Sequence, residues 1–167
     1  MKQIGVLSDT HGKVLEGGFI KFLSECDEIW HAGDIGNNEV VENLELIKPV
    51  KAVYGNIDGA EIRHLWPEYQ NFSCESVNVL ITHIGGRPGR YDKNIEPLLK
   101  NISPDLFVCG HSHILKIQYD KKRNFLFLNP GAAGMSGFHK VRTAVRFQIE
   151  EKNIKNMEIY EMDRKSG

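Results

Sequence analysis

The sequence is poor in features that mark several classes of protein. It has only three cysteines, and none is spaced as Cys-x-x-Cys, so neither a thiolate metal site nor a thiol redox motif is predicted. No apolar run approaches the ~18 residues of a membrane span, and the N-terminal MKQIGVLSDTHG lacks the apolar core of a signal peptide. We therefore expect a reduced, cytoplasmic protein with no membrane partner.

An excess of charge of one sign is also missing. The chain has 21 Lys and Arg against 22 Asp and Glu, which gives a formal net charge of -1. This balance provides no general positive field to hold a polyanion, so no stable nucleic-acid complex is expected. Because the 167 residues are 41% hydrophobic and contain no repeat or Pro/Gly/Ser-rich linker, the sequence predicts one globular domain over residues 1–167.

What the sequence does contain is a series of short apolar runs rich in Val, Ile or Leu. Runs of this length, followed by Gly, Asp, Asn or His, predict buried strands. They are Gln3–Leu7, Glu28–His31, Val50–Tyr54, Val77–Thr82 and Leu106–Cys109. Between the first three lie Leu15–Ser24 and Asn38–Ile47, whose apolar residues recur at helical spacing. This α/β alternation is typical of parallel βαβ units.

The second half of the chain is richer in strands. One helix is expected at Asp92–Asn101, and a turn is expected at Lys121–Asn124. The strands expected around that turn and after it are Ile114–Asp120, Phe125–Leu128, Thr143–Glu150 and Ile154–Met162. We interpret these strands as a second sheet packed on the first.

Polar residues follow all five buried runs. In open α/β sheets, ligands bind beyond the carboxyl ends of the strands, so these residues are predicted to gather at one edge. The set is Asp9, His11, Asp34, Asn56, His83, His111 and His113. Taken singly, Asp-x-His can be a helix cap, Gly-Asp or Gly-Asn a turn, and Gly-His-Ser-His a polar loop. Five such motifs at strand ends instead favour a metal site.

The donor types narrow the choice of metal. Imidazole and oxygen donors without thiolate suit Mn, Fe, Zn, Co or Ni better than Ca or Mg. Seven donors are too many for one ion. Two divalent ions about 3.5 to 4 Å apart that share one carboxylate would use them all, and that arrangement serves hydrolytic phosphoryl chemistry.

The order Asp-x-His, Gly-Asp, Gly-Asn-x-Asp, His, Gly-His-x-His resembles that of the calcineurin-like metallophosphoesterases, specifically the small YfcE-like phosphodiesterases, over nearly the whole chain. The resemblance implies a four-layer α-β-β-α sandwich with its metal site at the C-terminal ends of strands. It implies two divalent ions, manganese first, with Ni, Fe, Co or Zn as alternatives. One ion would be held by Asp9, His11, Asp34 and His113, and the other by Asp34, Asn56, His83 and His111. The implied reaction is attack by a metal-bound hydroxide on a small phosphodiester, such as a cyclic-nucleotide-like substrate.

The sequence departs from the wider family at one position. Many members carry a histidine after Gly-Asn that is thought to assist the leaving group, and Ile57 stands in that place here. Because this general acid is missing, the resemblance favours phosphodiesterase over broad monoesterase activity. Asn56, Asp58 and His83 are assigned to catalysis, with Asn56 expected to orient the phosphate and Asp58 to hold a ligand imidazole.

Other residues and functions remain open at this point. His31 is expected to pack beneath the site. His64 and His139 are interpreted as ordinary surface or loop residues, with assistance to a leaving group as the alternative role for either. Gly85–Arg90 is interpreted as a flexible loop, either one whose arginines contact phosphate or one that is simply solvated. The alternative functions are a phosphomonoesterase or pyrophosphohydrolase, and a non-catalytic scaffold like the retromer subunit of the same fold. The ligands also allow zinc-dependent hydrolysis of a non-phosphate ester, which only the resemblance disfavours. A homo-oligomer also stays open, with Leu65–Pro67 as one segment that could supply its contact.

Overall fold

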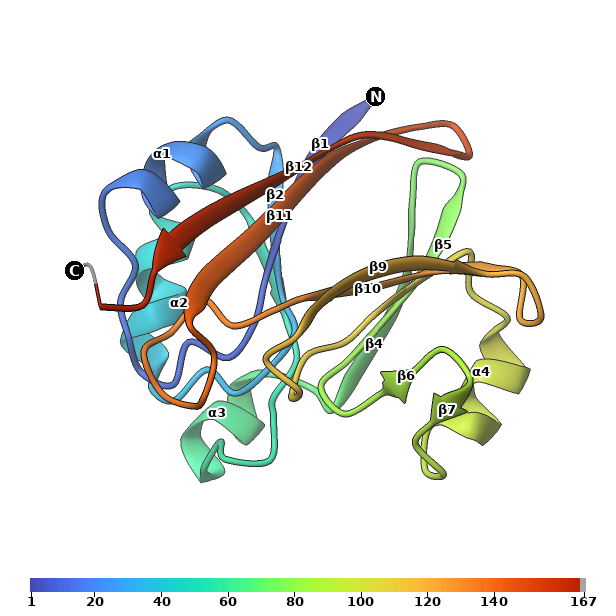
Figure 1. Cartoon of the computed structure of the whole chain (residues 1–167), viewed down its shortest axis with the longest axis horizontal. Coiled ribbons are helices and arrows are strands. Elements are labelled where there is room, and N and C mark those ends of the chain that lie inside the picture. The colour runs from blue at the N-terminus through green and yellow to red at the C-terminus, as the bar shows by residue number, and fades with distance from the viewer. Residues whose placement is uncertain (166–167) are drawn as a thin grey trace.

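The computed structural model describes residues 1–165, and most of its strands form two five-stranded sheets (Figure 1). The first sheet has the order β12-β11-β1-β2-β3, and the second has the order β4-β5-β8-β10-β9. The first comprises β1 (Lys2–Leu7), β2 (Glu28–His31), β3 (Val50–Ala52), β11 (Val141–Glu150) and β12 (Asn153–Asp163). The second comprises β4 (Tyr69–Cys74), β5 (Val77–Thr82), β8 (Leu106–Val108), β9 (Leu115–Asp120) and β10 (Phe125–Pro130).

Helices cover the outer faces of both sheets. The described helices are α1 (Gly18–Ser24), α2 (Asn38–Glu45), α3 (Ala60–Leu65) and α4 (Glu96–Ile102). Phe19 and Leu23, one helical turn apart on α1, pack with Leu44 of α2 against the first sheet. Leu99 of α4 packs against Phe107 of the second sheet. The α/β four-layer sandwich predicted above is therefore confirmed.

The main core lies between the two sheets. It is built by buried side chains such as Ile4, Val6 and Trp30 from the first sheet and Val79 and Val108 from the second. The strands β1, β2, β5 and β8 lie between a helix layer and the facing sheet. Their nearly continuous apolar runs follow from burial on both faces.

The structure corrects the predicted assignment of strands to sheets. β11 and β12 belong to the first sheet, because β11 pairs antiparallel with β1, with Gln3 opposite Gln148. The five buried runs do not share one sheet either, since β1, β2 and β3 lie in the first and β5 and β8 in the second.

Three local predictions also change. Helix α3 and strand β4 were not predicted, and the expected loop Gly85–Arg90 forms most of a small hairpin of β6 (Gly86–Arg87) and β7 (Arg90–Tyr91).

Within residues 1–165, no helix combines the length and apolarity needed to cross a membrane.

Candidate metal centre

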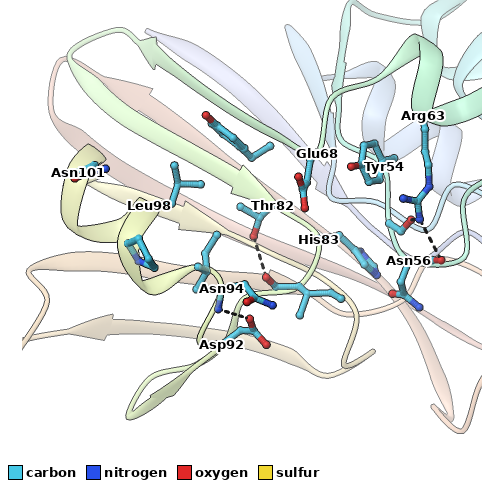
Figure 2. Close-up of a pocket in the computed structure, with 15 residues that line it drawn as sticks. Tyr54, Asn56, Arg63, Glu68, Thr82, His83, Asp92, Asn94, Leu98 and Asn101 are labelled. Carbon is cyan, nitrogen blue, oxygen red and sulfur yellow. Dashed lines mark hydrogen bonds between the residues drawn. The ribbon is translucent and has the colours of Figure 1, made fainter.

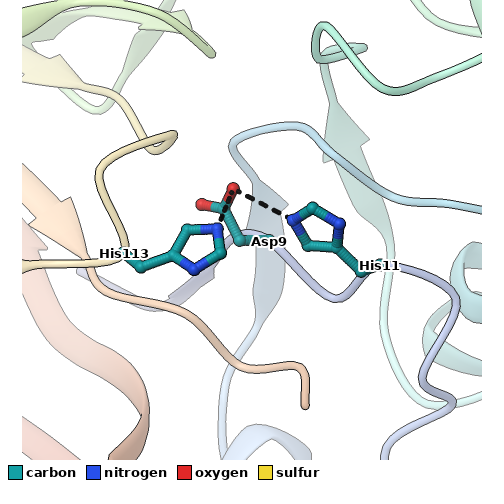
Figure 3. A group of neighbouring side chains, drawn as sticks. All are labelled: Asp9, His11 and His113. Carbon is teal, nitrogen blue, oxygen red and sulfur yellow. Dashed lines mark ion pairs between the residues drawn. The ribbon is translucent and has the colours of Figure 1, made fainter. Parts of the chain in front are cut away.

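Loops from both sheets bring the predicted donors together. The loop after β1 carries Asp9 and His11, and the loop after β8 carries His113; donor atoms of these three lie within 4.8 Å of one another (Figure 3). A second cluster consists of Asp34 after β2, His83 after β5 and His111 after β8. Its donor atoms also lie within 4.8 Å of one another. Six of the seven predicted donors therefore converge in two adjacent groups, although they come from two sheets rather than one.

Asp34 faces both groups. Its Oδ2 lies 3.5 Å from His11 Nε2 of the first cluster, and its Oδ1 lies 3.2 Å from His83 Nε2 of its own cluster. Asp9 Oδ1 lies 3.2 Å from His113 Nε2 and 3.9 Å from His83 Nε2. The two carboxylates thus stand between imidazoles of both clusters.

The donor set passes a direct test of fit to a metal. Asp9 Oδ1, His11 Nε2 and His83 Nε2 are buried and have no hydrogen-bond partner. Burying such atoms without partners costs free energy, and buried polar groups in proteins are nearly always satisfied. Because these atoms face one another across the two clusters, a divalent cation would satisfy them together.

Hydrogen bonds fix which ring nitrogen of two histidines is free. His83 Nδ1 lies 2.7 Å from the carbonyl oxygen of Ala32, so Nδ1 carries the proton and Nε2 keeps its lone pair for the cluster. His139 Nε2 lies 2.9 Å from the Gly134 carbonyl oxygen and must donate to it, which leaves His139 Nδ1 as an acceptor. That atom lies 3.3 Å from His113 Nδ1, so His113 donates there and turns the lone pair of its Nε2 toward Asp9.

The contact of His139 corrects the expectation that it is an ordinary loop residue. It belongs to no strand-end motif, and no spacing in the sequence connects it with His113, 26 residues earlier. The contact arises because the segment after β10 returns to the first sheet past the donor loops.

Comparison with known proteins agrees with this geometry. The family model described as the calcineurin-like phosphoesterase superfamily domain matches residues 1–152. The chain belongs to the calcineurin-like phosphoesterase superfamily. A probable metallophosphoesterase of Methanothermobacter thermautotrophicus is 31% identical over 137 residues, which cover 77% of this chain and 76% of the relative.

Solved structures share the fold at lower identity. The Chaetomium thermophilum Vps29 structure has a TM-score of 0.75 at 16% identity and covers 97% of both chains. An Entamoeba histolytica Vps29 structure complexed with zinc has a TM-score of 0.73 at 16% identity, covering 97% of this chain and 99% of that one. Family membership and the two donor clusters together assign a hydrolase with a divalent metal site.

The electrostatics of this phosphoesterase suit a cation. Burial opposes ionisation of Asp9, but the imidazoles of His11 and His113 outweigh it and hold the pKa of its carboxyl below the ordinary value. At Asp34, burial is likewise outweighed, chiefly by His83, and the pKa is lowered. Both carboxylates are therefore anionic at neutral pH, which is the form that binds a divalent ion.

Asp58 has a different contact from the predicted one. Its buried carboxylate accepts hydrogen bonds from the backbone N–H groups of Gly55 (2.8 Å), Ile35 (3.1 Å) and Gly36 (2.8 Å) rather than from an imidazole. It thereby ties the loop that carries Asp34 to the loop that carries Asn56. Asp58 positions two donor loops through their backbones.

His31 lies beneath the site, as predicted. Its Nδ1 accepts from the Gly33 N–H at 3.1 Å, and its Nε2 lies 2.9 Å from Thr10 Oγ1, which donates to the Ile35 carbonyl oxygen. This chain of bonds needs a neutral ring, and burial lowers the pKa of His31 to about 4. His31 therefore joins the loops after β1 and β2 without facing a metal.

Two cavities flank the second cluster. The first, of about 490 Å³, is walled by Tyr54 and Tyr69 and reaches His83; we call it the tyrosine cavity (Figure 2). The exposed Asn56, the seventh predicted donor, lines it beside His83. The second, of about 800 Å³, reaches His111 and shares Ile84, Asp92 and Asn94 with the first. It is lined by Arg87, Arg90, Lys93 and Lys116, and we call it the basic cavity.

Proposed function

We propose that this chain is a phosphodiesterase that hydrolyses small diesters with two divalent transition-metal ions, manganese being the first candidate. The observation that carries the proposal is the convergence of Asp9, Asp34 and four histidines, with buried donor atoms that have no other partner. When bound, the two ions would polarise the phosphoryl oxygens and provide a nucleophile from water at neutral pH.

Asp34 belongs to both of the proposed ligand sets. Asp9, His11, Asp34 and His113 would hold one ion, and Asp34, Asn56, His83 and His111 the other. The two oxygens of Asp34, which face imidazoles of different clusters, support its shared role. The Ile57 N–H donates to Asp34 Oδ1 at 3.1 Å and helps to fix this carboxylate in place.

The surroundings of the centre favour a diester. A phosphate at the cluster of Asp34, His83 and His111 would have one cavity on each side, and only a phosphate with two substituents can use both. Neither of the two residues that follow Asn56 is suited to protonate a leaving group. Ile57 is apolar, and the carboxylate of Asp58 accepts hydrogen bonds from backbone amides. Diesters with acidic leaving groups should therefore react fastest.

The test uses metal-stripped protein that is resupplied separately with Mn, Ni, Co, Zn, Fe or Mg. Turnover of an aryl phosphodiester and the matching monoester is compared for wild type, Asp34→Ala, His83→Ala and, as control, His64→Ala. His64 is an exposed histidine of α3 outside both clusters. We expect metal-dependent hydrolysis that favours the diester and is lost in the first two variants only.

Two other results would replace the proposal. A higher kcat/KM on the monoester or on a nucleoside polyphosphate would assign a monoesterase or pyrophosphohydrolase. Absence of turnover with every metal, although two ions bind, would assign a non-catalytic scaffold, a function that the Vps29-like fold by itself does not exclude.

A further inference from the structure

The basic cavity concentrates positive charge in a chain whose net charge is nearly zero. Arg87 and Arg90 come from the β6–β7 hairpin, Lys93 follows it, and Lys116 lies on β9. Asp92 is the one carboxylate among the described residues that line this cavity. The lining thus carries a formal excess of three positive charges, whereas the whole chain carries a net -1.

These cations have no acidic partners within residues 1–165. Elsewhere in the molecule, Arg123 pairs with Glu96, and Arg146 pairs with Glu25 and Glu158. By contrast, the four cations of the basic cavity form no ion pair with a described residue. Their charge is therefore available to a ligand.

The hairpin places its two exposed arginines opposite each other. Arg87 and Arg90 are directly opposite each other across the pair of strands. Pro88 and Gly89 form the turn between them, and Gly89 has φ +86°, the left-handed value that a glycine at the third position of a type II turn adopts. Like charges that face each other across an antiparallel pair destabilise it. An anion between the two guanidinium groups would reverse the sign of that interaction, and arginine suits bidentate contact with phosphate.

The position of the basic cavity indicates which kind of anion would bind there. His83 lines the tyrosine cavity, and His111 of the same donor cluster lines the basic cavity. A phosphate held at that cluster would direct one substituent toward the tyrosines and the other toward the arginines. We propose that the basic cavity binds a second phosphate group of the substrate, a short linkage away from the phosphate that is hydrolysed. This inference rests on the proposed phosphodiesterase function and narrows its substrate class to diesters with a further phosphate on one arm.

The test compares two substrates with the same scissile bond. One is ethyl para-nitrophenyl phosphate, and the other carries a terminal phosphate on the ethyl group, so both release para-nitrophenol. The double variant Arg87→Gln/Arg90→Gln removes the facing charges. Lys121→Gln/Lys122→Gln removes two exposed charges from the turn after β9, which does not line the basic cavity.

We expect the arginine variant to lower kcat/KM for the phosphate-bearing substrate by about tenfold or more, and to change it little for the ethyl diester. The lysine variant should change both by less than about twofold at physiological salt. The thermal midpoint of the arginine variant should stay the same or rise, because two opposed like charges are removed. Equal loss for both substrates, or equal loss in the lysine variant, would overturn the proposal.

A second measurement separates this inference from the proposed function. Metal-free wild type and Arg87→Gln/Arg90→Gln are titrated calorimetrically with inorganic tripolyphosphate, which requires no catalysis. If wild type hydrolyses neither diester with any metal, the phosphodiesterase proposal fails. Weaker tripolyphosphate binding by the variant would still support the phosphate subsite, whereas equal binding by both proteins would refute it.

Discussion

At the scale of single residues, five of the seven proposed donors are held in a backbone conformation that most residues avoid. Asp9, His11, Asp34, His111 and His113 all have positive φ, between 46° and 68°. Each such residue costs on the order of 1 kcal/mol or more, and such costs collect at functional sites where the surrounding structure enforces them. The loops therefore fix the donor directions before any ion arrives.

The first prediction concerns His139, which acts through His113. Replacing it with Ala removes the acceptor for His113 Nδ1 and frees that ring to turn, so metal affinity at the cluster of Asp9, His11 and His113 should fall about 10- to 100-fold. His139→Asn offers an amide oxygen as acceptor and should recover part of the affinity. Calorimetric titration of metal-free protein measures both effects.

His64→Ala is the matched control, since His64 is an exposed histidine that belongs to neither cluster. The thermal midpoint of the metal-free protein should differ little between His139→Ala and wild type. Equal affinities in wild type and His139→Ala would show that His113 does not depend on this contact.

The second prediction concerns the buried neutral His31. Its pKa is about 4 in the folded protein against 6.5 ordinarily, so between these values the unfolded chain takes up a proton that the folded chain does not. Uptake of this proton by the unfolded chain lowers the free energy of unfolding as the pH falls from 6.5 toward 4, by roughly 3 kcal/mol over that range.

Urea unfolding of metal-free wild type and His31→Gln at several pH values tests this. The variant should be less stable at pH 7, because its hydrogen bonds are disturbed, but its stability should fall less between pH 6.5 and 4. Parallel curves for the two proteins would mean that His31 titrates normally.

The residues that sequence reasoning found and missed differ in a physical way. The donors were predictable because each follows a buried run in its own local motif. The roles of Asp58 and His139 were not, because they depend on contacts between segments distant in the sequence, such as Asp58 with Ile35 and His139 with His113.

At the scale of elements, glycines allow the donor loops to approach one another. A Cβ on Gly55 would lie 2.0 Å from Asp34 Oδ1, and one on Gly33 would lie 2.7 Å from the His83 ring. A Cβ on Gly110 would lie 2.8 Å from Asp9 Oδ2. In each case the obstructed atom belongs to a donor carried by a different loop, so the glycines set the separation of the loops.

The third prediction uses two glycines of the loop after β3. Gly55→Ala should displace Asp34 and lower metal affinity about tenfold or more, since small shifts of ligand orientation have effects of this size. Gly59→Ala is the control, because a Cβ there meets no atom within 4 Å. Metal content per chain after dialysis distinguishes them, and equal loss in both variants would contradict this role of Gly55.

The elements that escaped prediction are the short and exposed ones. Helix α3 has six residues, too few to show helical periodicity, and β6 and β7 have two each. Strand β4 is an edge strand whose side chains are mostly exposed or half-buried, so it has no apolar run. Strands buried on both faces, such as β5, matched the predicted bounds because burial imposes an unbroken apolar sequence.

At the scale of the whole molecule, the centre lies where two sheets meet. The sheet to which β11 and β12 belong was not predictable. It depends on the pairing of β11 with β1, two strands at opposite ends of the sequence. The donor loops belong to β1 and β2 of one sheet and to β5 and β8 of the other. Metal ions would therefore link layers that are otherwise joined mainly by apolar packing between them.

The last prediction follows from this linkage. An ion that binds only the folded protein at one site stabilises it by about 2.7 kcal/mol at a free concentration 100 times the dissociation constant. For a domain of this size, chelation should then lower the thermal midpoint by about 5 to 10 °C for each ion that is removed. Asp34→Ala lacks the carboxylate that faces both clusters, so its midpoint should hardly respond to chelator. An unchanged midpoint in wild type that demonstrably loses its ions would mean that the unfolded chain binds the ions as tightly as the folded protein, which would contradict a centre assembled from the loops of two sheets.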